Sequence, residues 1–308
     1  MTLLGKTQNA YKHMIYFFFR LTRLLCFSLL LTAITANAEN DKIRIAVSDL
    51  LEGPVAESLN TLAEQRSVDL SVDVVGSLPA IDYLRSGKID LAIVAAPETI
   101  ELPEGDFETC PFAFDTTLIA VNTANPINEI SLSDLRAIFS IGADQDFNMW
   151  GDLAVQDWES RPIKPMASQD DETISLELFK FMVLGGDPMK VTVAEVKDSE
   201  IEGLMVSDTA SIGILSNPPK NKKIKVLAVS ADSDSPPFGP SNDNVYYGDY
   251  PIRMPFKILY NKNDLEKLED TFRILLSNEL ADVLLANDLY VTPINARRKL
   301  MADLNLDE

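Results

Sequence analysis

Apolar positions in the first third of the chain follow two different periods. Alternating apolar residues predict strands at 42–48 and 68–75, and the continuous apolar run at 91–96 predicts a strand buried on both faces. Helical spacing predicts a helix over 52–65 and a shorter one around Leu84. Strands that alternate with helices in this way predict an α/β fold.

The rest of the chain has the same alternation. A longer strand is expected at 112–122, followed by a helix that begins at Ser131 or Ser133, and a strong helix is expected at 172–184. Further strands are predicted at 163–167, 210–215, 224–229 and 256–260, further helices at 199–206, 264–276 and 279–285, and an exposed loop at 231–250. The order predicts two lobes, one formed by 39–118 with 226–308 and the other by 119–225, with a cleft between them.

The N-terminus is typical of a secretory signal peptide. Basic residues without any acid precede an apolar run at 24–31, and the small-residue triplet Ala36-Asn37-Ala38 follows. A membrane anchor is disfavoured because the run is shorter than the ~20 residues that span a bilayer. Residues 1–38 are therefore expected to be removed on export.

The exported chain is expected to be strongly acidic. Four of the 27 basic residues and none of the 47 acidic residues lie in the predicted leader, which leaves a net charge of about −24. Such a charge repels nucleic acid, so a nucleic-acid partner is not expected. The only histidine, His13, lies in the leader, and Cys110 is the one cysteine that remains. We therefore expect no metal cluster, no cofactor and no catalytic activity, and Cys110 is expected to be buried.

Several segments, taken in order, resemble the periplasmic phosphate-binding proteins of ABC importers. These are Gly76 to Ile81, Ile89 to Ile93, Leu118 to Asn122, Asn125-Pro126-Ile127, Leu132 to Ser140, Trp150 to Leu153 and Tyr250-Pro251-Ile252. The resemblance spans nearly the whole chain after the leader. It implies a two-lobed periplasmic-binding-protein type II fold in which each lobe is a mixed sheet flanked by helices.

The resemblance also implies a function. A protein of this family binds a small polar solute or oxyanion in the cleft between its lobes and presents it to an ABC permease in the inner membrane. Such proteins hold the anion at helix N-termini and by Ser and Thr hydroxyls. On motif position the candidate ligand-binding residues here are Ser48, Asp49, Gly76, Ser77, Ala95, Ser168, Asp171 and Thr173.

Three segments depart from the family pattern. After the first strand the family has a small, Gly- and Thr-rich turn, whereas this chain reads 48–53 as Ser-Asp-Leu-Leu-Glu-Gly. After the third strand the family has an aspartate that accepts a phosphate proton, whereas this chain has Ala95-Ala96. In the second lobe the family has an arginine before its Ser-Gly-Thr element, whereas this chain reads 167–173 as Ala-Ser-Gln-Asp-Asp-Glu-Thr. A carboxylate beside a partly desolvated dianion costs on the order of several kcal/mol. The ligand is therefore expected to be a neutral, amine-bearing or cation-associated solute, or to be absent.

Alternatives remain at each of these positions. The acids at 170–172 also suit a helix N-terminus without any ligand, Ser77 also suits a helix cap, and Trp150 suits simple packing. A shifted alignment would bring Arg161 or Lys164 into the missing cationic position. The second function considered is a non-transport descendant of the fold that binds another envelope protein.

Overall fold

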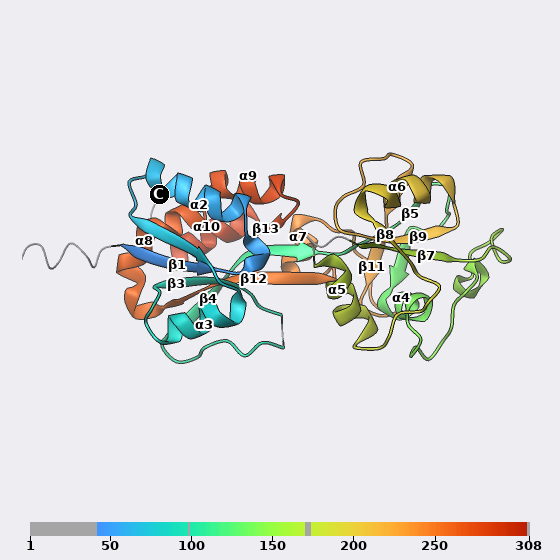
Figure 1. Ribbon diagram of the computed structural model, residues 1–308, viewed down its shortest axis with the longest axis horizontal. Coiled ribbons are helices and arrows are strands. Elements are labelled where there is room, and N and C mark those ends of the chain that lie inside the picture. Colours follow the sequence, from blue (N-terminus) through green and yellow to red (C-terminus); the bar gives the residue numbers. More distant parts are fainter. Residues whose placement is uncertain (1–41, 98, 170–173, 307–308) are drawn as a thin grey trace, which may run out of the picture. The chain divides into compact units, whose positions relative to one another are not determined.

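The computed structural model describes residues 42–97, 99–169 and 174–306; the predicted signal peptide lies outside these ranges. Its strands form a six-stranded sheet, here sheet A, a five-stranded sheet, here sheet B, and a two-stranded sheet (Figure 1). Helices flank both large sheets. The predicted α/β class is confirmed.

Sheet A has the strand order β13-β4-β12-β3-β1-β2. β1 and β3 are parallel, and β12 runs antiparallel to both β3 and β4. Its strands are β1 (Ile43–Val47), β2 (Leu70–Val74), β3 (Leu91–Ala95), β4 (Phe107–Thr116), β12 (Arg253–Asn261) and β13 (Tyr290–Val291). Its helices are the 3-10 turns η1 (Asp49–Leu51) and η4 (Lys262–Asp264), with α2 (Pro54–Gln65), α3 (Ser77–Arg85), α8 (Leu265–Leu275), α9 (Asn278–Ala286) and α10 (Ile294–Asp303).

The central strand β3 is covered on both faces. Ala92 and Val94 pack in one cluster with Ile81 and Leu84 of α3. The intervening Ile93 is also fully buried, and α2 and α9 lie on the side of the sheet opposite α3 (Figure 1). Burial on both faces explains why this strand is a continuous apolar run rather than an alternating one.

Sheet B has the strand order β10-β5-β9-β7-β8 and is mixed. β7 is parallel to β8 and β9, whereas β5 is antiparallel to β9 and β10. Its strands are β5 (Leu118–Asn122), β7 (Lys164–Gln169), β8 (Ala194–Lys197), β9 (Ser211–Leu215) and β10 (Ile224–Val226). The helices here are α4 (Leu132–Phe139), η2 (Trp150–Leu153), α5 (Ser175–Phe179), the π-helical η3 (Lys180–Leu184) and α6 (Asp198–Ser207).

Alternate residues of β5 pack into two separate hydrophobic clusters, one on each face of sheet B. Leu118 and Ala120 pack with Ile201 and Met205 of α6. Ile119 and Val121 belong to the larger cluster, which includes residues of α4 and α5. One five-residue strand thus holds helices on both faces of its sheet.

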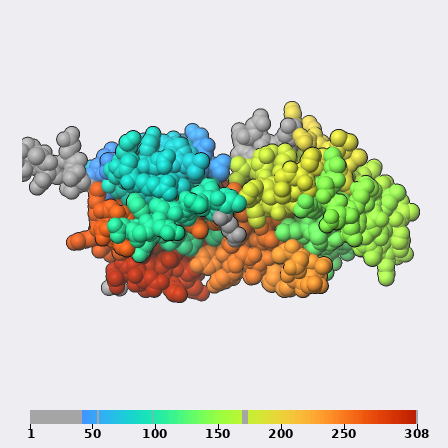
Figure 2. All heavy atoms as spheres, turned by 90° about the horizontal axis from the view of Figure 1, so that it is seen from below, coloured from blue at the N-terminus to red at the C-terminus, as the bar shows by residue number. Residues whose placement is uncertain are grey.

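A short two-stranded sheet and one helix complete the fold. β6 (Glu129–Ser131) pairs in parallel with β11 (Ala228–Ser230), and α7 (Asn242–Tyr247) follows. Leu227, Val229 and Val245 pack into the larger cluster of sheet B, although the sequence places 226–308 in the first lobe. The exact lobe boundaries stay a prediction. Figure 2 shows the blue-to-teal and red segments, which belong to sheet A and its helices, gathered in one part of the molecule although they are far apart in the sequence.

Three predicted segments are corrected by the structure. The single strand expected at 112–122 is two strands, β4 and β5, which belong to different sheets and break at Thr117. The strand expected at 224–229 likewise divides at Leu227. The loop expected at 231–250 contains α7 and the fully buried Tyr250. In the two strand cases the strand-like pattern continues across a change of partner sheet, because pattern reports burial and not which sheet provides it. In the third case a polar segment contains a short helix.

Other predictions are confirmed in outline. Ser131 caps α4 through a capping box with Asp134, so the earlier of the two proposed starts is right. Trp150 is fully buried and donates from Nε1 to the Ala210 carbonyl at 3.1 Å, which makes it a packing residue. Cys110 is buried in β4, and desolvation, with a smaller contribution from Glu108, raises the pKa of its thiol to about 12.

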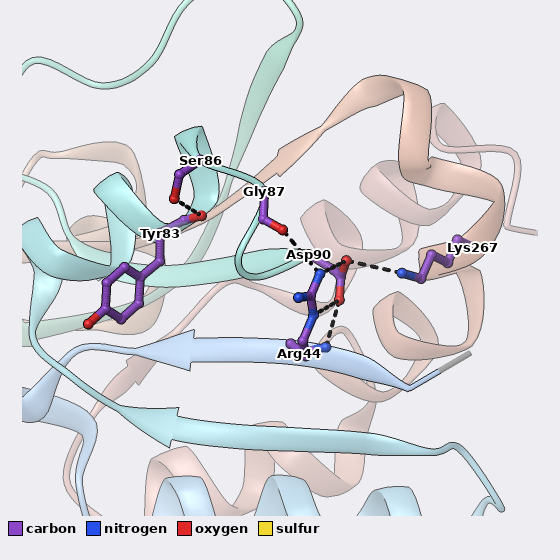
Figure 3. A network of polar contacts seen from close by, with 6 residues as sticks. All are labelled: Arg44, Tyr83, Ser86, Gly87, Asp90 and Lys267. Atoms are coloured by element: carbon purple, nitrogen blue, oxygen red, sulfur yellow. Dashed lines mark hydrogen bonds and ion pairs between the residues drawn. The ribbon is translucent and has the colours of Figure 1, made fainter. Parts of the chain in front are cut away.

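A buried carboxylate ties the strands of sheet A together at the edge where β1 and β3 begin. Asp90 accepts from the Arg44 backbone N–H at 2.8 Å, from the Arg44 guanidinium at 3.1 Å and from Lys267 Nζ at 3.0 Å (Figure 3). Arg44 also donates to the Gly87 carbonyl after α3. Burial opposes the charge, but these hydrogen bonds outweigh it and lower the pKa of Asp90. One side chain therefore fixes β1, β3 and α8 relative to each other.

We expect Asp90→Asn to lower the free energy of unfolding by about 2 kcal/mol at pH 7, because charge-assisted hydrogen bonds to two cations are lost. A carboxylate with a lowered folded pKa stabilises above its unfolded pKa near 4, and this stabilisation disappears as the pH falls below it. Urea unfolding at pH 7 and pH 3 measures both effects. Asp82→Asn, which removes an exposed pair with Arg85, is the control and should change stability by under about 0.5 kcal/mol.

Candidate functional site

Three loops that follow strands of sheet A meet at one edge of that sheet. The Ser48 N–H donates to the Ile93 carbonyl at 2.8 Å, which places the end of β1 beside the end of β3. The Val75 N–H donates to the Val47 carbonyl at 3.1 Å, which brings the turn before α3 to the same level. The structure thus brings together Ser48, Asp49, Gly76, Ser77 and Ala95, and their binding of a ligand stays a prediction.

A chain of hydrogen bonds joins these residues. The Ala95 N–H donates to Ser77 Oγ at 3.0 Å, and Ser77 Oγ donates to Ser48 Oγ at 3.1 Å. Ser48 Oγ in turn donates to Asp49 Oδ1 at 3.3 Å, and it also accepts the Leu50 N–H. Ser48 is fully buried, whereas Asp49 is exposed. We call this chain from Ala95 to Asp49 the serine relay. Both serine hydroxyl protons in it are already used within the protein.

The serine relay ends against the start of α3. Gly76 precedes this nine-residue helix with φ of 84° and ψ of 159°, and Asp49 Oδ1 lies 3.7 Å from where a Cβ on Gly76 would stand. The N-terminus of a helix carries a partial positive charge and unpaired N–H groups, which favour an anion. Here the protein's own Asp49 carboxylate is the anion beside that terminus.

The candidates of the second lobe are only partly described. Ser168 is the next-to-last residue of β7 in sheet B, is buried, and donates to Asp198 Oδ1 at 2.7 Å at the start of α6. Asp171 and Thr173 lie outside the described residues. Ser168 therefore belongs to a different sheet from the serine relay, and its hydroxyl also ends on a carboxylate.

The two cations proposed as substitutes for the missing arginine have other partners. Lys164 forms an ion pair with Asp208. The Arg161 guanidinium lies 4.1 Å from the centre of the Trp158 ring. Neither contact involves Ser168. In the described residues, therefore, neither Arg161 nor Lys164 takes the place of the family's missing arginine beside Ser168.

Sequence reasoning missed the residues where the chain passes between the two sheets. Thr117, between β4 and β5, donates from Oγ1 to the Ser175 carbonyl at 2.7 Å and accepts the Tyr250 hydroxyl on its own carbonyl at 2.7 Å. The Thr117 N–H donates to the Ile252 carbonyl. The sequence signal for this contact was the family-like motif Tyr250-Pro251-Ile252. The motif alone did not reveal that its residues join the two sheets.

The described part of the chain also bears on metals and membranes. Among its residues, no group of three or more His, Cys, Asp or Glu side chains is arranged to hold a metal ion. None of the described helices combines the length and apolar character needed to cross a bilayer.

Comparison with known proteins gives a consistent result. A family model described as the PBP superfamily domain matches residues 32–273. Protein SphX of Synechococcus elongatus is 26% identical over 234 residues, which cover 70% of this chain and 66% of SphX. The phosphate-binding protein PstS of Pseudomonas aeruginosa is 24% identical over 257 residues, which cover 78% of this chain and 79% of PstS.

The fold is shared with solved structures. The crystal structure of PstS from Borrelia burgdorferi matches with a TM-score of 0.64 at 16% identity, covering 82% of this chain and 99% of that one. At this identity the likeness concerns the fold, which confirms the two-lobed type II architecture predicted from the sequence.

We expect Gly76→Ala to destabilise the protein by about 1–3 kcal/mol, because the backbone angles at Gly76 lie in a region that L residues rarely adopt. The space is sufficient, since the nearest atom to an added Cβ is 3.7 Å away, so the cost is conformational. Gly203→Ala is the matched control: this exposed glycine lies in α6 with no atom near an added Cβ, and alanine there should stabilise by about 0.5–1 kcal/mol. Equal effects of the two substitutions in chemical denaturation would contradict the argument.

Proposed function

Because the chain belongs to the PBP superfamily, we propose that it is an exported solute receptor whose ligand is a small polar solute other than free phosphate. In this proposal the protein works in the periplasm, closes its two lobes on the solute by a hinge motion, and presents it to an ABC permease in the inner membrane. It acts as a binding protein and not as an enzyme. The relatives named as phosphate-binding proteins support the solute-receptor part of the proposal.

The observation that carries the proposal is the end of the serine relay on Asp49. A phosphate dianion at the start of α3 would meet the Asp49 carboxylate there, and the hydroxyl protons of Ser48 and Ser77 already point to acceptors inside the protein. Two negative charges about 5 Å from a third are disfavoured by roughly 2 kcal/mol even in water, and by more when water is excluded. The site is therefore better suited to a neutral or cationic group.

Two further features agree with this ligand class. β3 ends with Ala95 and is followed by Ala96, and neither residue offers a carboxylate to accept the proton of a phosphate ion. In sheet B the Ser168 hydroxyl donates to Asp198 rather than standing free for an anion. Both described halves of the candidate site thus direct serine hydroxyls toward carboxylates.

A second candidate function is supported by a separate surface. The groove between α4, the 142–145 segment and η3 measures about 610 Å³. Ile141, Phe181 and Met182 are exposed beside it or within its lining. Exposed apolar side chains around a groove favour contact with another protein. An envelope sensor or protein-binding module on this fold remains the alternative to a transport receptor.

The proposal is tested by thermal unfolding of the protein with and without 1 mM phosphate, and then with a panel of neutral and amine-bearing solutes. A solute with micromolar affinity at 1 mM stabilises by about 4 kcal/mol, which raises the Tm by on the order of 10 °C. We expect no such rise with phosphate and a rise with a member of the panel. A large phosphate shift would overturn the proposed ligand class, and no shift with any solute would favour the protein-binding alternative.

We also expect Asp49→Asn to increase the affinity for phosphate, because it removes the negative charge beside α3 while keeping the size of the side chain. Titration calorimetry with phosphate measures the change. Asp73→Asn removes an equivalent charge from an exposed position on β2 and should leave phosphate binding unchanged. Equal phosphate binding by the Asp49 variant and the unmodified protein would argue against Asp49 as the excluding group.

A further inference from the structure

Asp115 lies at the same edge of sheet A as the serine relay. Ala95 of β3 and Ala113 of β4 are both paired with Phe256 of β12, so these two alanines stand level across the sheet. Asp115 follows two residues after Ala113 and is paired with Met254. It is therefore level with residue 97, just beyond the end of β3, where the loops of the candidate site begin.

The Asp115 carboxyl has no cationic partner among the described residues. Its Oδ1 accepts the Thr116 backbone N–H at 2.7 Å, and no described lysine or arginine forms an ion pair with it. The cation of the neighbouring strand, Arg253, lies opposite Thr116 and donates to the carbonyls of Val245 and Tyr246. Desolvation raises the pKa of Asp115 to about 6.

The titratable groups that face Asp115 from the other side add no positive charge. Tyr290 of β13 is paired with Phe114, and the charges of Asp288 and Asp115 contribute to a raised pKa of its phenol, after the larger effect of burial. Asp115 and Asp288 therefore both act on the same phenol. A positive charge near this end of β4 is Arg253, whose guanidinium lies 5.2 Å from the centre of the Phe114 ring and donates to backbone carbonyls.

Asp115 also stands where the chain leaves sheet A for sheet B. Thr117, two residues later, is held by Ser175 from one side and by Tyr250 and Ile252 from the other. The Asp115 backbone is thus fixed by the ladder to β12 and by the contacts of Thr117. A fixed, partly buried carboxyl with a single backbone donor has acceptor capacity left for an external group.

On these grounds we propose that Asp115 is the counter-charge of the solute site and selects solutes that carry an ammonium or guanidinium group. The inference rests on the proposed receptor function and specifies its ligand class. Burial disfavours the negative charge of the Asp115 carboxylate, and a bound cation offsets that cost. A neutral solute of the same size does not interact with this charge in the same way.

The test uses two matched pairs of probes, arginine with citrulline and putrescine with 1,4-butanediol, so that each pair differs in the cationic group. Binding is measured by titration calorimetry on the unmodified protein, on Asp115→Asn and on the control Asp106→Asn, which removes an exposed carboxylate at the opposite end of β4. We expect at least one cationic probe to bind better than its neutral partner. Asp115→Asn should weaken that probe by about 10- to 100-fold and leave the neutral probe unchanged.

A measurement on the unmodified protein gives a second readout that does not depend on a variant's folding. Because a carboxyl with a pKa of about 6 is mostly protonated at pH 5, binding of the cationic probe should be about tenfold weaker at pH 5 than at pH 8. Asp106→Asn should retain this pH dependence, and Asp115→Asn should lose it.

The outcomes separate this inference from the proposed function. If a cationic probe binds equally well to the protein with and without Asp115→Asn, the inference is wrong while the receptor function stands. Binding of only neutral or anionic solutes leads to the same conclusion. If no probe and no solute of the wider panel binds, the receptor function fails and the role of Asp115 fails with it.

Discussion

The hydrogen bond from the Tyr250 hydroxyl to the Thr117 carbonyl holds the place where the chain passes from sheet A to sheet B. Tyr250 is fully buried, and Ile252 accepts the N–H of the same threonine just before β12 returns to sheet A. A phenol and a carbonyl buried without this bond would each cost free energy, so the outgoing and returning segments are fixed together. The chain therefore leaves sheet A and returns to it through one hydrogen-bonded point.

Carboxylates occupy positions in the candidate site where the related proteins are expected to hold an anion. The family resemblance implies loops that collect an anion at helix N-termini, yet the start of α3 here is already beside Asp49, and Ser168 is already bound to Asp198. The protein supplies its own negative groups where an oxyanion would otherwise be held. Asp115 at the same edge of sheet A adds a carboxylate, and this is why we propose a cationic solute rather than an anionic one.

The sequence predicted most of the elements, because buried strands such as β3 and capped helices such as α4 carry strong local signals. It also predicted the meeting of Ser48 with Ser77, since parallel strands end at one edge of a sheet. It failed at Thr117, where the expected strand continues in the sequence although the partner sheet changes. The serine relay depends on contacts between distant segments, which no local pattern encodes.

The burial of Cys110 matters for fluorescent labelling of this protein. It is the single cysteine among the described residues, it is buried in β4, and its thiol has a pKa of about 12, so almost none of it is thiolate near neutral pH. Alkylating dyes react with the thiolate and need access to it. A cysteine introduced at an exposed position can therefore be labelled in preference to Cys110 in the folded protein, and its fluorescence would report on the proposed lobe movement.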